Sequence, residues 1–142
     1  MTTDTLHPAF VHTADRLDTA VREVMRPGVI VISGHASVAC AQRALLAHGV
    51  HAVLVLDDPG GCPLGWVTSR GLLTWAHRDI ALSAARDAVT EPPLQIDPSA
   101  SAHEALALLE REGATRLLVV RGGDGVPEGV VADVDLLRLF AR

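Results

Sequence analysis

The chain has 142 residues, 49% of them hydrophobic but only 3% aromatic, and its 17 acidic and 12 basic side chains give a net charge of −5. This length suffices for one compact unit or two packed half-domains, and the scarcity of aromatics predicts a core of Ala, Val and Leu. The negative charge argues against nucleic-acid binding, and the sequence shows neither a secretory leader nor the apolar run of about 20 residues that a membrane-spanning helix needs. We therefore expect a cytoplasmic protein with no nucleic-acid or membrane partner.

The first half of the chain alternates helical and strand patterns after a polar N-terminal tail at residues 1–13. Apolar residues at helical spacing predict a helix over Asp15–Met25, which Pro27-Gly28 ends. Apolar runs and turn residues then predict a strand at Val29–Ile32, a helix from about Ser37 to His48 closed by Gly49, a strand at Ala52–Leu56, a turn at 57–61, a strand at Pro63–Thr68 and a helix at Ser69–His77.

The second half is predicted to repeat this order. Asp79–Val89 supplies a linker and a first helix, and Ser101 with Glu104 has the spacing of a helix capping box. The remaining expected elements are a strand at Leu94–Ile96, a helix at Ser101–Glu112, a strand at Arg116–Val120, a turn at 122–125, a strand at Pro127–Ala132 and a helix at Asp133–Ala141.

The two halves are copies of one another without a gap. Gly65–Leu73 recurs as Gly129–Leu137, 64 positions later, and aligning 21–76 with 85–140 gives 15 identities in 56 pairs. Because a half with so few strands cannot cover its own sheet, we expect the two copies to pack together.

The order of these elements, with Met-x-Pro before the first strand and G-x-x-[T/S]-x-x-[D/N] at a strand–helix junction, resembles the cystathionine β-synthase (CBS) domain. Val21–Pro27 is similar to the opening of that family, Arg86–Thr90 is a weaker echo, and the resemblance covers about residues 18–141. It implies an α+β (α/β) fold of two pseudo-symmetric β-α-β-β-α modules packed sheet to sheet, with module 1 at 14–78 and module 2 at 79–142.

The resemblance also implies a function. CBS pairs are regulatory modules, not enzymes, and this chain would sense an adenosine-containing ligand (AMP, ADP, ATP or S-adenosylmethionine) in the cleft between modules and signal to a separate, unidentified partner protein. A homodimer is implied, parallel or antiparallel, and no cofactor is required. A ligand-free dimeric interaction scaffold with degraded nucleotide motifs stays open as the alternative.

The family motif is split between the two copies. In the family the acid accepts hydrogen bonds from the ribose hydroxyls, the Thr or Ser helps to hold phosphate, and the glycine permits close backbone approach. Thr68 keeps the hydroxyl while Gly71 replaces the acid, whereas Asp135 keeps the acid while Ala132 replaces the hydroxyl. The second copy is therefore the better predicted site, with backbone N–H groups at the start of the last helix as phosphate donors. The expected ligand-binding residues are Gly129, Ala132, Asp133, Asp135, Thr115, Arg116, Gly65, Trp66, Thr68 and Arg70.

Structural roles stay open for three of these residues. Arg116 is either the cation nearest the ligand or a solvated charge at a strand end. Asp135 is either a ribose acceptor or a first-turn acid that complements the helix dipole. Trp66 either stacks on a base or packs in a core or an interface.

Catalytic and metal sites are not expected. The sequence has no G-x-S-x-G motif, and the histidines around Gly49 have no recurring counterparts in the second copy. Cys40 and Cys62 are predicted to be reduced thiols, since neither position belongs to a CxxC motif or recurs as a cysteine in the second copy.

Overall fold

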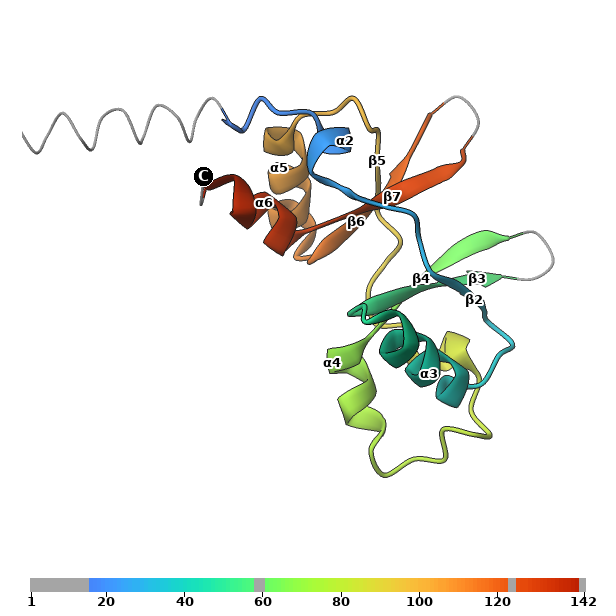
Figure 1. Cartoon of the computed structure of the whole chain (residues 1–142). Helices are drawn as coiled ribbons and strands as arrows, with labels where there is room; N and C mark the ends of the chain where they lie inside the picture. Colours follow the sequence, from blue (N-terminus) through green and yellow to red (C-terminus); the bar gives the residue numbers. More distant parts are fainter. Residues whose placement is uncertain (1–15, 58–60, 123–124, 141–142) are drawn as a thin grey trace, which may run out of the picture. The chain divides into compact units, whose positions relative to one another are not determined.

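A computed structural model describes residues 16–57, 61–122 and 125–140. The expected N-terminal tail at 1–13 lies outside these residues. The chain divides into two compact units, one formed by the segment up to Gly28 together with Gln95–Arg142, and the other by Val29–Leu94. Each unit combines a sheet with helices, which confirms the predicted mixed α+β class (Figure 1).

The unit Val29–Leu94 contains a three-stranded sheet in the order β2-β3-β4. Strand β2 (Val31–Ser33) pairs in parallel with β3 (Ala52–Asp57), which pairs antiparallel with β4 (Cys62–Thr68). Helix α3 (Val38–His48) lies on one face of this sheet together with α4 (Ser69–Leu72) and its 3₁₀ continuation η1 (Leu73–Trp75). The core between sheet and helices is built from Val38, Ala41, Leu45, Val53, Val55, Val67, Trp75, Ala85 and Ala88.

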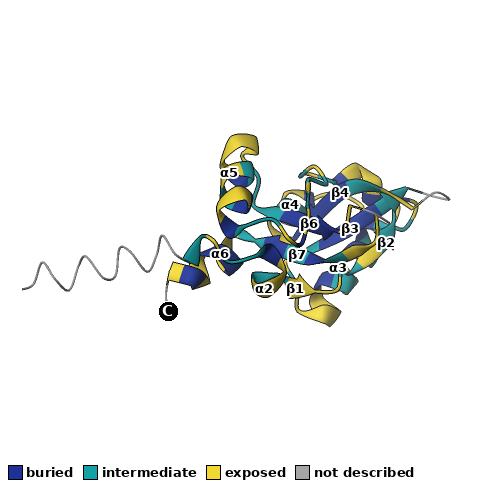
Figure 2. Ribbon diagram, turned by 90° about the horizontal axis from the view of Figure 1, so that it is seen from above, coloured by how far each residue is buried: buried dark blue, intermediate teal, exposed yellow. Residues whose placement is uncertain are grey.

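The other unit has a four-stranded sheet in the order β1-β7-β6-β5. Its strands are β1 (Arg26–Pro27), β5 (Gln95–Ile96), β6 (Arg116–Val120) and β7 (Pro127–Ala132). Its helices are α2 (Val21–Val24), α5 (Ala102–Glu112) and α6 (Asp133–Phe140). Figure 2 shows that β6 is largely buried while the outer side of α5 is exposed.

The long helix of each unit begins and ends in the same way. The Ser37 hydroxyl accepts from the Cys40 N–H at 3.1 Å, and the Ser101 hydroxyl accepts from the Glu104 N–H at 3.1 Å. Both helices end at a glycine in the left-handed conformation, Gly49 (φ 62°) and Gly113 (φ 64°). These findings confirm the predicted glycine cap at Gly49 and the hydroxyl half of the predicted capping box.

The short helix at the start of each repeat packs against the long helix of the other repeat. Helix α2 contacts α5, and the 3₁₀ helix η2 (Ala85–Ala88) contacts α3. Equivalent bridges join Ala20 to Ser101 and Ser37 to Ala84. The compact units therefore group the segments differently from the sequence repeats, on which the expected modules at 14–78 and 79–142 were drawn.

Three predicted helices are shorter or tighter than expected. Within the described part of the helix predicted over Asp15–Met25, only Arg16 and Val21–Val24 are α-helical, and the helix is interrupted because Ala20 is extended and bridged to Ser101. The first helix predicted for the second copy, within Asp79–Val89, is the single 3₁₀ turn η2. The helix predicted at Ser69–His77 changes to 3₁₀ after Leu72, as the Thr74 hydroxyl donates to the Gly71 carbonyl at 2.7 Å. The other predicted helices and the strands are found within a few residues of their expected bounds.

Asp97 ties the loop before α5 to the β6–β7 hairpin. Its carboxylate accepts from the Ser99 hydroxyl at 2.6 Å, the Ser99 N–H at 2.8 Å and the Gly122 N–H at 3.3 Å. The hydrogen bonds from Ser99, with smaller contributions from Gly122 and the positive charge of Arg121, lower the pKa of Asp97 from its ordinary 3.8.

We expect this lowered pKa to make the stability of the fold pH-dependent. Because the folded-state pKa of Asp97 lies below the unfolded value, its stabilisation is complete above the unfolded pKa and is lost as the pH falls through the folded one. Urea unfolding at pH 5 and pH 3, values chosen to bracket about pH 4, should therefore show a larger loss of stability for the wild type than for Asp97→Asn. Identical losses in the two proteins would contradict this role.

Candidate functional site

The candidate site is the junction at which the last strand of each unit enters a helix. In one unit β4 leads into α4, and in the other β7 leads into α6. The backbone is held identically in both, since the Ser69 N–H donates to the His51 carbonyl and the Asp133 N–H donates to the Thr115 carbonyl, each at 2.9 Å. The repeat therefore reproduces the backbone of the site, and the two junctions differ in their side chains.

Each junction keeps one half of a capping box. The Thr68 hydroxyl accepts from the Gly71 N–H at 2.9 Å, three residues into α4. The Asp135 Oδ2 accepts from the Ala132 N–H at 2.8 Å, in the reverse direction. A complete capping box has both bonds, a hydroxyl at the N-cap and a carboxylate at the third helical position. The split seen in the sequence therefore divides the two capping bonds between the copies.

The Asp135 carboxylate is enclosed by basic side chains. Its side chain is only 1% exposed, and its Oδ1 accepts from Arg138 Nη1 at 2.9 Å and Arg26 Nε at 3.3 Å. With Ala132, three donors engage this carboxylate. The electrostatic partners that a buried carboxylate requires are thus supplied by α6 itself and by β1.

The equivalent positions of the other unit carry no charges. Thr90 stands in place of Arg26, Gly71 in place of Asp135 and Thr74 in place of Arg138. A Cβ added at Gly71 would lie 3.0 Å from the Thr68 hydroxyl oxygen and 3.2 Å from the Thr90 hydroxyl and methyl. The charged cluster is therefore found at the β7–α6 junction and not at the β4–α4 junction, where Gly71 leaves little room for an acid.

The two motif glycines permit a close approach by the chain's own backbone. A Cβ at Gly129 would overlap the carbonyl oxygen of Arg26, and one at Gly65 would overlap the carbonyl oxygen of Glu91. In register, Pro27 of β1 stands opposite Gly129, and Glu91 bridges to Trp66. The neighbouring backbone, at Arg26 in one unit and at Glu91 in the other, thus explains why a glycine is needed at each position without invoking a ligand.

Trp66 is buried, with only 1% of its surface exposed. Its backbone N–H donates to the Glu91 carbonyl, and its carbonyl accepts from the Thr90 N–H. Its indole N–H has no acceptor in the part of the chain that the structure describes. Burial favours the packing role for Trp66 over an exposed stacking surface.

The other expected site residues surround the α6 junction or lie in the other unit. Arg116 begins β6 opposite Ala132, and its guanidinium donates to the Thr115 hydroxyl at 3.0 and 3.3 Å. Asp133 is exposed, and its Oδ1 accepts from the Val134 N–H at 2.7 Å. Arg70 is exposed in the first turn of α4.

The start of α6 is not an open row of N–H donors. The N–H groups of Ala132, Asp133 and Val134 all have acceptors, namely Asp135, the Thr115 carbonyl and the Asp133 side chain. The exposed Asp133 carboxylate also lies in this first turn, and it would repel a phosphate placed at these N–H groups. The geometry therefore does not favour the expected phosphate site at the backbone of this helix start.

Arg26 and Arg138 are contacts of the site that sequence reasoning missed. Arg138 had a local signal, since it follows Asp135 by three residues and so lies on the same face of the helix. Arg26 had no local signal in the sequence, since 109 positions separate it from Asp135.

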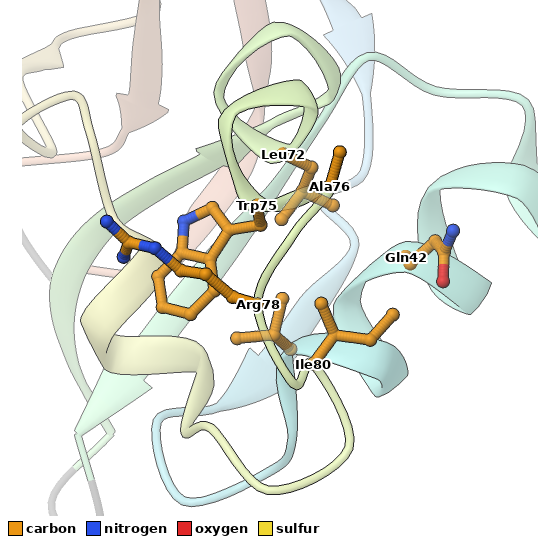
Figure 3. Close-up of a pocket in the computed structure, with 7 residues that line it drawn as sticks. Gln42, Leu72, Trp75, Ala76, Arg78 and Ile80 are labelled. Atoms are coloured by element: carbon orange, nitrogen blue, oxygen red, sulfur yellow. The ribbon is translucent and has the colours of Figure 1, made fainter.

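A hollow is found beside the helices of each unit, and the one in the unit of Asp135 reaches Asp133 at the start of α6. In the unit Val29–Leu94, a cavity of about 200 Å³ lies between α3, the α4–η1 segment and the loop that follows it (Figure 3). At this cavity the Arg78 guanidinium stacks over the Trp75 ring, 4.5 Å from the ring centroid. In the other unit, an open hollow of about 300 Å³ lies between α5 and α6. Its lining includes Leu106, Leu137 and Phe140.

Residues 16–57, 61–122 and 125–140 contain neither a metal-binding cluster nor a membrane-spanning helix. No group of three or more His, Cys, Asp or Glu side chains in these ranges could hold a metal ion. Cys40 and Cys62 are free thiols, as predicted. None of the described helices has the length and apolar character needed to cross a membrane.

Comparisons with known proteins identify the fold. The family model described as "CBS domain" matches twice, at residues 21–78 and 85–142. The CBS domain of a bacterial CNNM/CorC family Mg²⁺ transporter, solved in complex with ATP, is similar with a TM-score of 0.81 and 21% identity, covering 96% of this chain and 97% of that one. A CBS domain protein from Pyrobaculum aerophilum complexed with AMP is similar with a TM-score of 0.72 and 17% identity, covering 87% and 99%. No curated protein matched the chain.

Proposed function

Because this chain belongs to the CBS domain family and carries two copies in tandem, we propose that it is a regulatory module that binds an adenosine-containing ligand and signals to a separate protein. The observation that carries this proposal is the buried Asp135 at the β7–α6 junction, where one copy keeps the acid of the family motif. Similar structures that contain ATP and AMP support adenosine as the ligand class.

The asymmetry of the two copies supports one working site. The compact unit that holds Asp135 combines this buried carboxylate with two arginines, whereas the other unit has Gly71, Thr74 and Thr90 in their place. An uncharged junction offers a nucleotide no charge-assisted hydrogen bond, and such bonds contribute about 1.5–3 kcal/mol each. We therefore propose binding of one nucleotide per chain.

A ligand that binds only the folded protein should raise its melting temperature. At 100 times the dissociation constant the stabilisation is about 2.7 kcal/mol, or several degrees for a chain of this size. We expect such a shift in a thermal-shift and calorimetric screen with at least one of AMP, ADP, ATP and S-adenosylmethionine, with NADH included for comparison. Asp135→Asn keeps the size of the side chain and should remove the shift, while Asp18→Asn, at an exposed acid of the same compact unit, should retain it.

The second candidate function is a ligand-free scaffold that acts through dimerisation. Exposed apolar side chains favour it, since Leu46 and Leu73 are each 76% exposed in one unit and Leu137 is 62% exposed in the other. We propose a homodimer in either case. A flat response to every nucleotide, with a dimer in light scattering, would favour the scaffold over the sensor.

A further inference from the structure

Two arginines converge on one oxygen of Asp135. Arg138 Nη1 lies 2.9 Å and Arg26 Nε 3.3 Å from Oδ1, so the two guanidinium groups are neighbours. The carboxylate is 1% exposed, yet the Arg26 and Arg138 side chains are 59% and 60% exposed. The buried carboxylate therefore accepts one hydrogen bond from each of two guanidinium groups that are otherwise exposed to solvent.

The cluster has more positive charge than its acid needs. One arginine neutralises one carboxylate, so the triad of Arg26, Asp135 and Arg138 carries a net charge of +1 in a chain whose net charge is −5. A guanidinium has five N–H donors, and each arginine uses one of them in its hydrogen bond to Asp135. Donors of both groups thus remain directed toward solvent, where they can hold a planar or tetrahedral oxyanion.

The acidic neighbour on the same helix does not cancel this charge. Asp133 and Asp135 are two residues apart, which places them about 200° apart around the helix axis. Asp133 is engaged with the Val134 N–H at the helix start. Arg138, three residues after Asp135, lies on the Asp135 side of the helix.

We propose that Arg26 and Arg138 bind the phosphate group of the ligand and that Asp135 acts as a positioning residue for them, rather than as an acceptor for ribose. This inference rests on the proposed function and names the ligand class as phosphate-bearing. It locates recognition at one copy, since Thr90 and Thr74 replace the two arginines in the other. It also assigns the phosphate to side chains instead of the backbone N–H groups of α6, which already have acceptors.

The test is calorimetry on the full chain with inorganic phosphate, pyrophosphate, adenosine, AMP and ATP. We expect AMP and ATP to bind at least about tenfold more tightly than adenosine, since a charge-assisted hydrogen bond contributes a factor of this order or more. Arg26→Gln and Arg138→Gln should each weaken AMP binding about tenfold or more, and Arg→Lys at either position should retain part of it because the charge remains. Arg111→Gln is the matched control, since Arg111 is exposed and forms its ion pair with the adjacent Glu112.

The outcomes separate this inference from the proposed function. Adenosine binding as tightly as AMP, or AMP binding unchanged in both Gln variants, would overturn the arginine site and leave the adenosine sensor standing. Arginine-dependent binding of phosphate or pyrophosphate without any nucleotide binding would support the anion site and overturn the proposed function. Absence of binding by all five compounds would overturn the arginine site, and it would overturn the proposed function as well if ADP and S-adenosylmethionine also left the melting temperature unchanged. Melting curves of each variant show that it is folded, and one arginine stays paired with Asp135 in every single variant.

Discussion

Gly129→Ala is expected to destabilise the fold by about 3 kcal/mol, in the upper range for forced overpacking. The added methyl group would overlap the carbonyl oxygen of Arg26 and lie 2.9 Å from the Met25 sulfur. Backbone atoms cannot move aside as a flexible side chain can, so β1 would have to separate from β7. Gly65→Ala should cost at least as much, since its Cβ would meet the Glu91 carbonyl and its φ of +146° is strained for any other residue.

Two other glycines provide matched controls for urea unfolding. A Cβ at Gly122 would lie 3.5 Å from Asp97 in ordinary contact, so Gly122→Ala should change stability by less than about 0.5 kcal/mol. Gly113 has a φ of +64° but open space around it, so Gly113→Ala isolates the conformational cost, which is about 1 kcal/mol. If Gly129→Ala were as stable as Gly122→Ala, the close antiparallel pairing of β1 with β7 at Gly129 would be contradicted.

Asp135→Ala is expected to lower the free energy of unfolding by about 2 kcal/mol. It removes the acceptor of the Ala132 N–H, a capping bond that contributes about 1 kcal/mol, and the shared partner of Arg26 and Arg138. The ion pairs add about 1 kcal/mol and not the full value for a buried pair, because both arginines are well exposed and can regain water.

The comparison for this variant is Asp133→Ala in the same helical turn. Asp133 is exposed and has no arginine partner among the described residues, so its loss should cost about 0.5 kcal/mol, the size of a helix-dipole contribution. Equal effects of the two variants in urea unfolding would show that the arginine cluster contributes no stability. Nucleotide binding to Asp135→Ala has to be measured at a temperature at which this less stable variant remains folded.

Features that depend on neighbours in the chain were predictable from the sequence. The 64-residue repeat, the hydroxyl cap at Ser101 and the glycine cap at Gly49 were predicted from spacing, and the structure shows the same caps at the repeat partners Ser37 and Gly113. Each depends on residues at most a few positions apart, whose conformational preferences act before any tertiary contact forms. The CBS family assignment rests on the order of such local features, and the family model confirms it.

The length of the first helix could not be predicted from local patterns. Apolar spacing favours a helix through Asp15–Met25, but Thr19 and Val21 bond instead to Ala102 and Ala100, about 80 residues away. These bonds hold Ala20 extended, so that helix α2 begins only at Val21. Tertiary pairing overrides helix propensity here, because propensity differences are only a few tenths of a kcal/mol per residue.

The sequence by itself determined that this protein is a tandem CBS pair and that its two nucleotide motifs are each incomplete. Only the tertiary structure decided what the surviving residues contact: Thr68 caps a helix, Gly129 accommodates a crossing strand, and Asp135 is enclosed by Arg138 and the distant Arg26. The physical reason is that composition and periodicity carry short-range preferences, whereas the environment of a buried charge is set by chain segments that meet only when the whole unit folds.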